Sequence, residues 1–308
     1  MVQYVLVTGA GGFLGSHICR YFGGKGYKIA AVGRFSSSLQ TVNSYPNLWK
    51  FYGMTLPDIR FINVVKEFQP DLLIHCAGTA SVADSVSQPY NDFQRTVEVC
   101  AFTLEVIRKE IPQCRFILLS SAAVYGNPEK LPVSETVQCK PVSPYGYHKM
   151  ICETLAQEYS SLHGVPVSIL RIFSAYGEGL RRQVVFDLCR KFTDATGDTI
   201  EVLGTGEESR DFIHALDIAR AIEYIYKNQA DGIFNIASGT QTKIKTLTNL
   251  IQNELHSNKN ISFRGVGRKG DPLNWEADIS RLSKLGYCSQ VDFIEGVKSY
   301  VEWFKQNN

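Results

Sequence analysis

Short apolar runs alternate with longer amphipathic segments along the first part of the chain. The runs are rich in β-branched and aliphatic residues, which is typical of strands buried on both faces of a parallel sheet. The segments between them repeat their apolar residues at helical spacing. The predicted strands are 2–7, 28–32, 49–52, 71–76, 115–119 and 165–172, and the predicted helices include 59–68, 90–110 and 145–163. This alternation predicts a doubly wound parallel α/β sheet.

Beyond residue 172 the alternation becomes less regular. The helices predicted there are 184–194, 215–226, 245–255 and 291–304, with short strands near 200–203, 232–236 and 261–263. A chain of 308 residues is long enough to form two lobes. We expect a sheet domain over 1–172, with later returns near 205–240, and a smaller C-terminal α/β lobe mainly over 173–308. The lobe is then the expected place of substrate recognition, with the site in the cleft between the two parts.

A glycine-rich turn follows the first predicted strand, with Gly9, Gly12 and Gly15 at intervals of three and a helical repeat after them. Strand, glycine turn and helix in succession form the context that a dinucleotide-binding motif requires. Without β-carbons a pyrophosphate can approach the backbone amides, and a helix N-terminus favours its negative charge. We predict cofactor contacts at the three glycines, Phe13 and Leu14, which makes 1–172 a dinucleotide-binding domain. A glycine turn without a ligand is the alternative.

The second predicted strand ends without an acidic residue. Folds selective for NAD usually carry Asp or Glu there to bind the ribose 2′-hydroxyl. This chain instead has Arg34, followed by Ser36 and further serines, and these groups suit a 2′-phosphate. The pattern favours NADP(H) over NAD(H), with Arg34 and Ser36 as ligands; a solvated arginine is the alternative. After the fourth predicted strand, Ala77 would let the backbone pass under the cofactor.

The composition excludes several other classes of protein. A formal net charge of +2 gives no case for nucleic-acid or membrane attraction. The eight cysteines include no C-x-x-C pair and no zinc-type spacing, so we expect no metal site and a reducing compartment. The first strand begins at once, which leaves no room for a signal peptide, and no apolar run is long enough to span a bilayer. We expect a cytoplasmic protein.

Tyr145 and Lys149 stand four residues apart at the start of a predicted helix, so they share one face. An isolated phenol loses its proton only near pH ~10, which is too high for efficient proton transfer at neutral pH. A lysine ammonium and an oxidised nicotinamide beside it favour the phenolate. Ser121 lies at the carboxyl end of the fifth strand, where such sheets bind ligands. We predict Ser121, Tyr145 and Lys149 as the catalytic set, with Tyr145 and Lys149 also contacting the cofactor. Tyr147 is the rival tyrosine, but it points differently from Lys149.

Four motifs stand in the order of a known family: T-G-A-G-G-F-L-G at 8–15, S-S-A-A-V-Y-G at 120–126, Y-G-Y-H-K at 145–149 and R-D-F-I-H at 210–214. Together they resemble the extended short-chain dehydrogenase/reductases that act on nucleotide-sugars, namely epimerases, 4,6-dehydratases and 4-keto-sugar reductases. The resemblance implies a Rossmann fold, an NAD(P) cofactor and a nucleotide-sugar substrate. It also implies a homodimer formed through a four-helix bundle, to which the helices after Tyr90 and Tyr145 contribute.

The resemblance also assigns substrate-binding residues. Arg210 matches a family arginine that binds the diphosphate, and Arg268 matches a second one; Ser121 would contact the sugar. A guanidinium suits both positions because it pairs with phosphate in bidentate geometry, although each arginine could instead be an exposed basic residue. Ser-Ala-Ala at 121–123 stands where the dehydratases have Thr-Asp-Glu, so dehydration is not expected. Gly-Met at 53–54 replaces the usual Gly-Asp that contacts adenine.

Three functions fit these residues. The leading hypothesis is NADPH-dependent reduction of a 4-keto sugar, because Arg34 favours NADP and cells hold NADP mostly reduced. The alternative is an NDP-sugar 4-epimerase. In that reaction the same Ser/Tyr/Lys set oxidises the sugar, the keto intermediate rotates in the site, and hydride returns to its other face. A cofactor-binding regulator without turnover is a third class, which the intact catalytic set disfavours.

Overall fold

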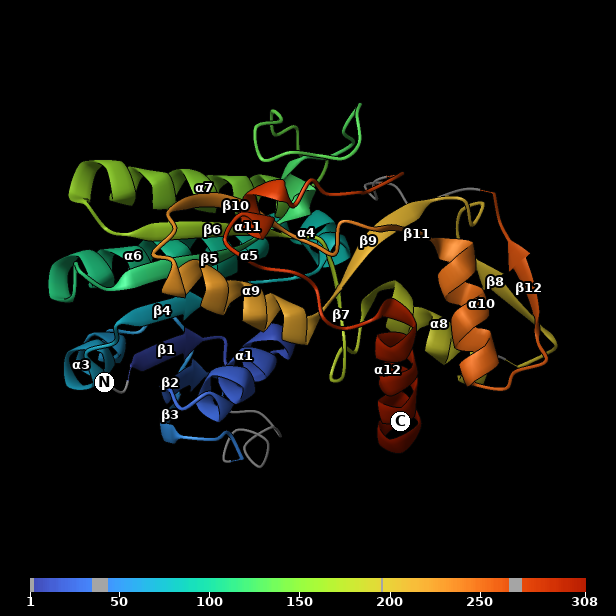
Figure 1. The fold of residues 1–308 in the computed structure, drawn as a ribbon, viewed down its shortest axis with the longest axis horizontal. Coiled ribbons are helices and arrows are strands. Elements are labelled where there is room, and N and C mark those ends of the chain that lie inside the picture. The colour runs from blue at the N-terminus through green and yellow to red at the C-terminus, as the bar shows by residue number, and fades with distance from the viewer. Residues whose placement is uncertain (1–2, 35–43, 195, 266–272) are drawn as a thin grey trace.

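A computed structural model describes residues 3–34, 44–194, 196–265 and 273–308. Its centre is a seven-stranded parallel sheet in the order β10-β6-β5-β4-β1-β2-β3 (Figure 1). The strands are β1 (Tyr4–Thr8), β2 (Lys28–Gly33), β3 (Leu48–Gly53), β4 (Leu72–His75), β5 (Arg115–Ser121), β6 (Val167–Ile172) and β10 (Gly232–Ile236). The order reverses between β1 and β4, which is where such sheets bind ligands. The predicted doubly wound Rossmann-type α/β fold is confirmed.

Helices cover both faces of this sheet because successive strand residues point to opposite faces. Val5 and Val7 of β1 pack on the side of α1 (Phe13–Gly24) and α9 (Ala215–Lys227). Leu6 between them packs on the other side, where the helices are α3 (Arg60–Phe68), α6 (Val99–Glu110) and α7 (Pro144–His163). Helices α6 and α7, to which the resemblance assigns the dimer bundle, contact each other along the sheet. A homodimer stays a prediction.

The helix predicted over 90–110 is not regular in the structure. It begins as α5 (Pro89–Phe93), continues as a π-helical segment, η1 (Gln94–Glu98), and becomes α-helical again in α6. Single π-helical turns inside α-helices are rare overall, but those that occur are often found at functional sites. A short helix, α4 (Val82–Ser87), precedes it and was not expected from the sequence pattern.

The rest of the chain forms a separate set of layers, on the right in Figure 1. Three short strands form one sheet in the order β11-β9-β7, and two more form a parallel pair. These strands are β7 (Ser174–Tyr176), β9 (Ser209–His214), β11 (Gln241–Lys243), β8 (Thr199–Val202) and β12 (Asn260–Phe263). The helices are α8 (Gln183–Asp194), α10 (Ile244–Glu254) and α12 (Phe293–Asn307), which share an apolar core, whereas the short helix α11 (Ser280–Ser283) packs against β10 of the main sheet.

The chain crosses between these parts more than once. After β9 it enters α9 and β10, which belong to the main sheet, before it returns to β11 and α10. The domain boundary at residue 172 stays a prediction. Among the residues that the structure describes, none of the helices has the length and apolar character that a bilayer-spanning segment needs.

A buried ion pair attaches α7 to the ends of two central strands. The Arg171 guanidinium of β6 donates to both oxygens of Glu153 on α7, at 2.7 Å from Nη2 and 3.1 Å from Nε. Ser120 of β5 donates a further bond of 2.5 Å to the same carboxylate. Both charged side chains are about nineteen-twentieths buried, at 5% and 4% exposed. The register of α7 against the sheet therefore depends on these polar contacts.

Glu153→Gln removes the charge but keeps the shape, so the Arg171 guanidinium stays buried without its anionic partner. We expect the free energy of unfolding to fall by about 3 kcal/mol, measured by urea denaturation. The matched control is Asp194→Asn, which breaks the exposed ion pair with Arg190 and should leave the urea midpoint nearly unchanged. Equal effects of the two substitutions would contradict this account.

Candidate active site

The turn between β1 and α1 closes tightly under β4. Gly9 has a φ of +68°, and a β-carbon there would lie 2.8 Å from the backbone of Cys76 and Ala77. A β-carbon on Gly15 would lie inside van der Waals contact with the Gly9 carbonyl oxygen. Only glycine fits these two positions, because the turn, the helix and the neighbouring strand share one small space.

The N-terminus of α1 meets this turn without a side-chain cap, since Gly12 occupies the N-cap position. The first amides of a helix have no carbonyl partner within the helix, and they carry the positive end of its dipole. The first helical residues here are Phe13, Leu14 and Gly15. The glycine turn and these amides fit the pyrophosphate of a dinucleotide.

The neighbouring strands bring further predicted cofactor residues to the same edge. Ala77 follows β4, and its amide donates to the Thr8 hydroxyl at 3.3 Å. Arg34 follows β2, which pairs with β1, and it is exposed. Ser36 lies outside the described residues. The structure thus gathers the three glycines and Ala77 around one turn and leaves Arg34 at the next strand end.

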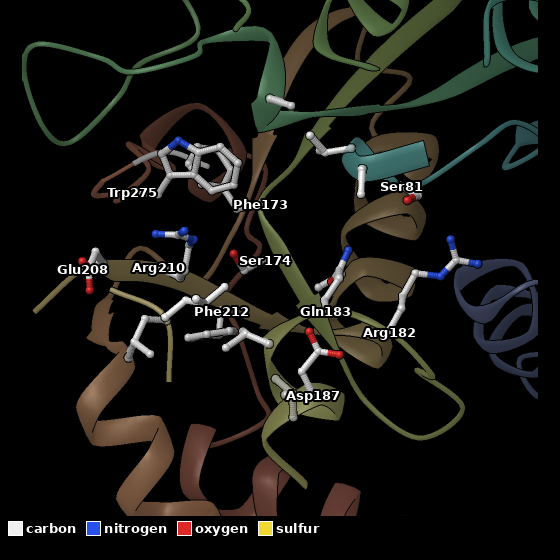
Figure 2. A pocket seen from close by; sticks show the side chains of 18 of the residues that line it. Ser81, Phe173, Ser174, Arg182, Gln183, Asp187, Glu208, Arg210, Phe212 and Trp275 are labelled. Carbon is white, nitrogen blue, oxygen red and sulfur yellow. The ribbon is translucent and has the colours of Figure 1, made fainter. Parts of the chain in front are cut away.

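A cavity of about 830 Å³ opens between the main sheet and the C-terminal part. Ser121 and Tyr145 line it from the main sheet, and Ser174 and Arg210 line it from the other part. Figure 2 shows Arg210 below Trp275, with Ser174 between Arg210 and Gln183 of α8. Its volume is in the range that holds small-molecule ligands. In the described part of the chain, no group of three His, Cys, Asp or Glu side chains is placed to hold a metal ion.

The start of α7 is fixed against the loop after β5. Ser143 caps the helix by accepting from the Gly146 amide at 3.2 Å, and a β-carbon on Gly146 would lie 2.7 Å from the Ala123 carbonyl oxygen. The Tyr145 amide donates to the Ser85 hydroxyl of α4 at 3.1 Å. These contacts place Tyr145 beside the loop that begins with Ser121, so the two predicted catalytic residues share the cavity.

Lys149 lies one helical turn further along α7 and does not line the cavity. Its side chain is buried, and Nζ donates to the Leu119 carbonyl at 2.9 Å. The ammonium is 5.9 Å from the centre of the Tyr145 ring. Burial, and after it the nearby Lys149 charge, lowers the pKa of His75 to about 3. The Lys149 ammonium thus lies near both the Tyr145 ring and His75, whose Nδ1 is 3.1 Å from the Thr8 hydroxyl. Tyr147, the rival tyrosine, is 50% exposed and does not line the cavity.

Arg210 and its neighbour Asp211 have different environments. The Arg210 guanidinium donates to the Ser209 carbonyl at 2.9 Å and lies 5.8 Å from the centre of the Trp275 ring. The Asp211 carboxylate is buried and accepts from the amides of Ser238 and Ala277, and burial raises its pKa. Asp211 therefore ties three segments together, while Arg210 faces the cavity. Arg268, the second predicted phosphate ligand, lies outside the described residues.

Several cavity residues were not expected from the sequence. Trp275 and Phe173 pack edge to face with ring centres 5.7 Å apart, and Asp187 rises from α8 (Figure 2). Ser81 and Ala80 line the opposite wall from the loop after β4. Isolated aromatic and small residues carry no periodic signal. Only the position of Ser81 and Ala80 after a strand end could have indicated them.

The family model that matches this chain describes the NAD dependent epimerase/dehydratase family and covers residues 5–237. The UDP-glucose 4-epimerase of Rhizobium leguminosarum bv. trifolii is 27% identical, over 99% of this chain and 98% of its own length. A solved UDP-N-acetylglucosamine 4-epimerase from Methanobrevibacter ruminantium, in complex with UDP-N-acetylmuramic acid, matches with a TM-score of 0.91 and 27% identity, covering 100% of this chain and 99% of its own. MoeE5 in complex with UDP-glucuronic acid and NAD matches with a TM-score of 0.88 and 25% identity, covering 99% and 100%.

These similarities change two of the expectations from the sequence. They do not support the reduction of a 4-keto sugar as the main activity, and they agree better with the 4-epimerase alternative. They support NAD(H) as the cofactor, whereas the preference for NADP(H) drawn from Arg34 finds no support. The arginine and serines that follow β2 and the missing acid were therefore not enough to decide between the two cofactors.

The family model covers all seven strands of the main sheet except Tyr4, the first residue of β1. The whole-chain similarities extend this match to the C-terminal part. The chain is an enzyme of the NAD-dependent epimerase/dehydratase family.

Proposed function

We propose that this enzyme is a UDP-sugar 4-epimerase that works with bound NAD. The observation that carries the proposal is the shared cavity: Ser121 and Tyr145 line the same space as Arg210, and Lys149 lies behind Tyr145. The names of similar proteins, UDP-glucose 4-epimerase and UDP-N-acetylglucosamine 4-epimerase, support this choice within the family.

Tyr145 would act as the acid and base of the reaction. Its phenolate takes the proton of the sugar 4-hydroxyl as the C4 carbon is oxidised to a ketone, and its phenol returns that proton when the ketone is reduced. The buried Lys149 ammonium lies 5.9 Å from the Tyr145 ring centre, where it attracts the negative charge that develops on the phenol oxygen during proton transfer. The Ser121 hydroxyl donates to the same sugar oxygen and orients it. The bound nicotinamide supplies the chemistry of accepting and returning hydride.

The walls of the cavity near Tyr145 suit a change of sugar orientation. Small side chains line this region, so a keto sugar has room to present its other face. They are Ala80, Ser81, Ala83, Ser121, Ala123 and Ser143. Attachment of the sugar through its diphosphate, which we assign to Arg210, would hold the nucleotide while the sugar turns. Return of hydride to the second face then gives the C4 epimer with no net consumption of cofactor.

The first prediction separates an epimerase from a reductase. Purified protein incubated with UDP-glucose or UDP-N-acetylglucosamine, with no cofactor added, should form the C4 epimer, detected by NMR. The reduced-nicotinamide absorbance should show no net change, because each hydride removed is returned. The nicotinamide dinucleotide released from the denatured protein should be NAD(H). Stoichiometric oxidation of added NADPH by a 4-keto nucleotide-sugar would instead establish the reductase.

The second prediction concerns proton transfer. Tyr145→Phe removes the hydroxyl and should lower kcat by at least ~100-fold, the contribution typical of a general acid–base group. Its affinity for NAD, measured by calorimetry, should stay close to that of the unaltered protein. Tyr147→Phe on the same helix is the matched control and should keep full activity, since Tyr147 is exposed outside the cavity. Normal turnover by the Tyr145 variant would remove it from the mechanism.

The third prediction concerns the diphosphate. Arg210→Gln removes a charged donor and should weaken the binding of UDP by about 10- to 100-fold, measured by calorimetry. Arg190→Gln alters an exposed arginine of α8 that pairs with Asp194 and should leave UDP affinity unchanged. If both variants bind UDP as tightly as the unaltered protein, Arg210 is not a phosphate ligand.

A further inference from the structure

A buried carboxylate lies beside the proposed active site and takes no part in the mechanism above. Asp92 of α5 is 3% exposed. One of its oxygens accepts from the Thr79 hydroxyl, and the other contacts Nδ1 of His148. A carboxylate removed from water is costly unless it is paired. Both oxygens of Asp92 are paired here, one of them with a residue of the catalytic helix.

The directions of these hydrogen bonds follow from the groups involved. An ionised carboxylate only accepts, so His148 donates from Nδ1 and Thr79 donates its hydroxyl proton. The Thr79 oxygen lies 2.9 Å from the Thr96 hydroxyl, which must then be the donor of that bond. The Thr79 amide in turn donates to the Thr96 oxygen at 3.3 Å. Thr96, Thr79, Asp92 and His148 thus form one chain of hydrogen bonds.

This series of hydrogen bonds connects two elements that form the site. His148 lies on α7 directly before Lys149 and one turn after Tyr145. Thr79 lies in the loop after β4, between the predicted cofactor residue Ala77 and the cavity residues Ala80 and Ser81. Asp92 comes from a third element, the helix α5, which contacts both α4 and α7 (Figure 1).

The hydrogen-bonded series also includes a residue of the irregular helix. Thr96 lies within the π-helical segment and is 2% exposed. Its hydroxyl contacts both the amide and the hydroxyl of Thr79, and its carbonyl oxygen accepts from the Cys152 thiol of α7 at 3.7 Å. The π-helical turn therefore lies against both the loop and the catalytic helix.

We propose that Asp92 and His148 are positioning residues for the reaction at Tyr145, because together they hold the loop at 77–81 in a fixed place relative to α7. The proposal rests on the proposed function for its kinetic effect, but the physical link between loop and helix is independent of it. Displacement of a reacting group by about 1 Å can cost ~100-fold in rate, so a loosened loop should lower turnover.

The experiment compares two substitutions of His148. His148→Leu removes the donor to Asp92, whereas His148→Asn keeps an N–H close to the place of Nδ1. We expect the Leu variant to lose about 10- to 100-fold in kcat with little change in KM, and the Asn variant to recover most of that loss. His163→Leu, at the exposed far end of α7, is the matched control and should match the unaltered protein.

A second measurement does not depend on activity. Hydrogen–deuterium exchange of the purified protein should be faster over 77–83 in His148→Leu than in His148→Asn or the unaltered protein. Thr79→Val, which removes the hydrogen bond from Thr79 to Asp92, should give the same local increase in exchange rate. Because Thr79 and His148 act through Asp92, the double variant Thr79→Val/His148→Leu should be no slower in turnover than His148→Leu alone.

Either of two results would overturn the proposal: full kcat in a folded His148→Leu variant, or unchanged exchange over 77–83 in both single variants. Equal losses in the Asn and Leu variants would also overturn it, since the donor to Asp92 would then not matter. Should His148→Leu fail to fold, Thr79→Val and His148→Asn give the same comparison. If the unaltered protein epimerises no UDP-sugar, the proposed function fails, and the exchange measurement alone decides the link.

Discussion

The attachment of α7 to the sheet is the constraint on which the rest of the site depends. Glu153 binds Arg171 and Ser120 at the ends of β6 and β5, and Lys149 binds the Leu119 carbonyl one turn earlier. Buried charges do little for stability relative to a well-packed apolar core, but removing one partner leaves the other buried and unpaired at a high cost, so an arrangement that separates them is disfavoured. These contacts come from Leu119 and Ser120 of β5 and from Arg171 of β6, which pairs with Ser120, so they fix α7 and hence Tyr145 relative to the strand end that carries Ser121.

In the second half of the chain, a buried carboxylate likewise fixes a wall of the cavity through hydrogen bonds. Asp211 binds amides at 238–239 and 277, so the strand that carries Arg210 is joined to the segment that carries Trp275. The Arg210 side chain faces the cavity, whereas the Asp211 carboxylate is buried. Of these two adjacent residues, Arg210 lines the cavity and Asp211 supports the wall of that cavity.

Much of this could be predicted from the sequence, where the physical signal is local. The buried strands and the glycine turn are defined by side-chain pattern and by the size of single residues, and Tyr145 and Lys149 are adjacent on one helix. The strands β7 and β11 are three residues long, too short for a periodic signal. Asp92 and His148 are 56 residues apart, so their pairing exists only after folding. The preference for NADP(H), drawn from Arg34, the serines after it and the missing acid at the end of β2, found no support among the similar proteins.

The close approach of Gly15 to Gly9 also separates two kinds of variation open to this enzyme. The turn between β1 and α1 leaves no space for even a methyl group at Gly9 and Gly15, so substitution there is blocked by sterics. Arg34, the residue after β2, is by contrast exposed. A substitution at Arg34 therefore meets no steric barrier of the kind that the glycine turn imposes.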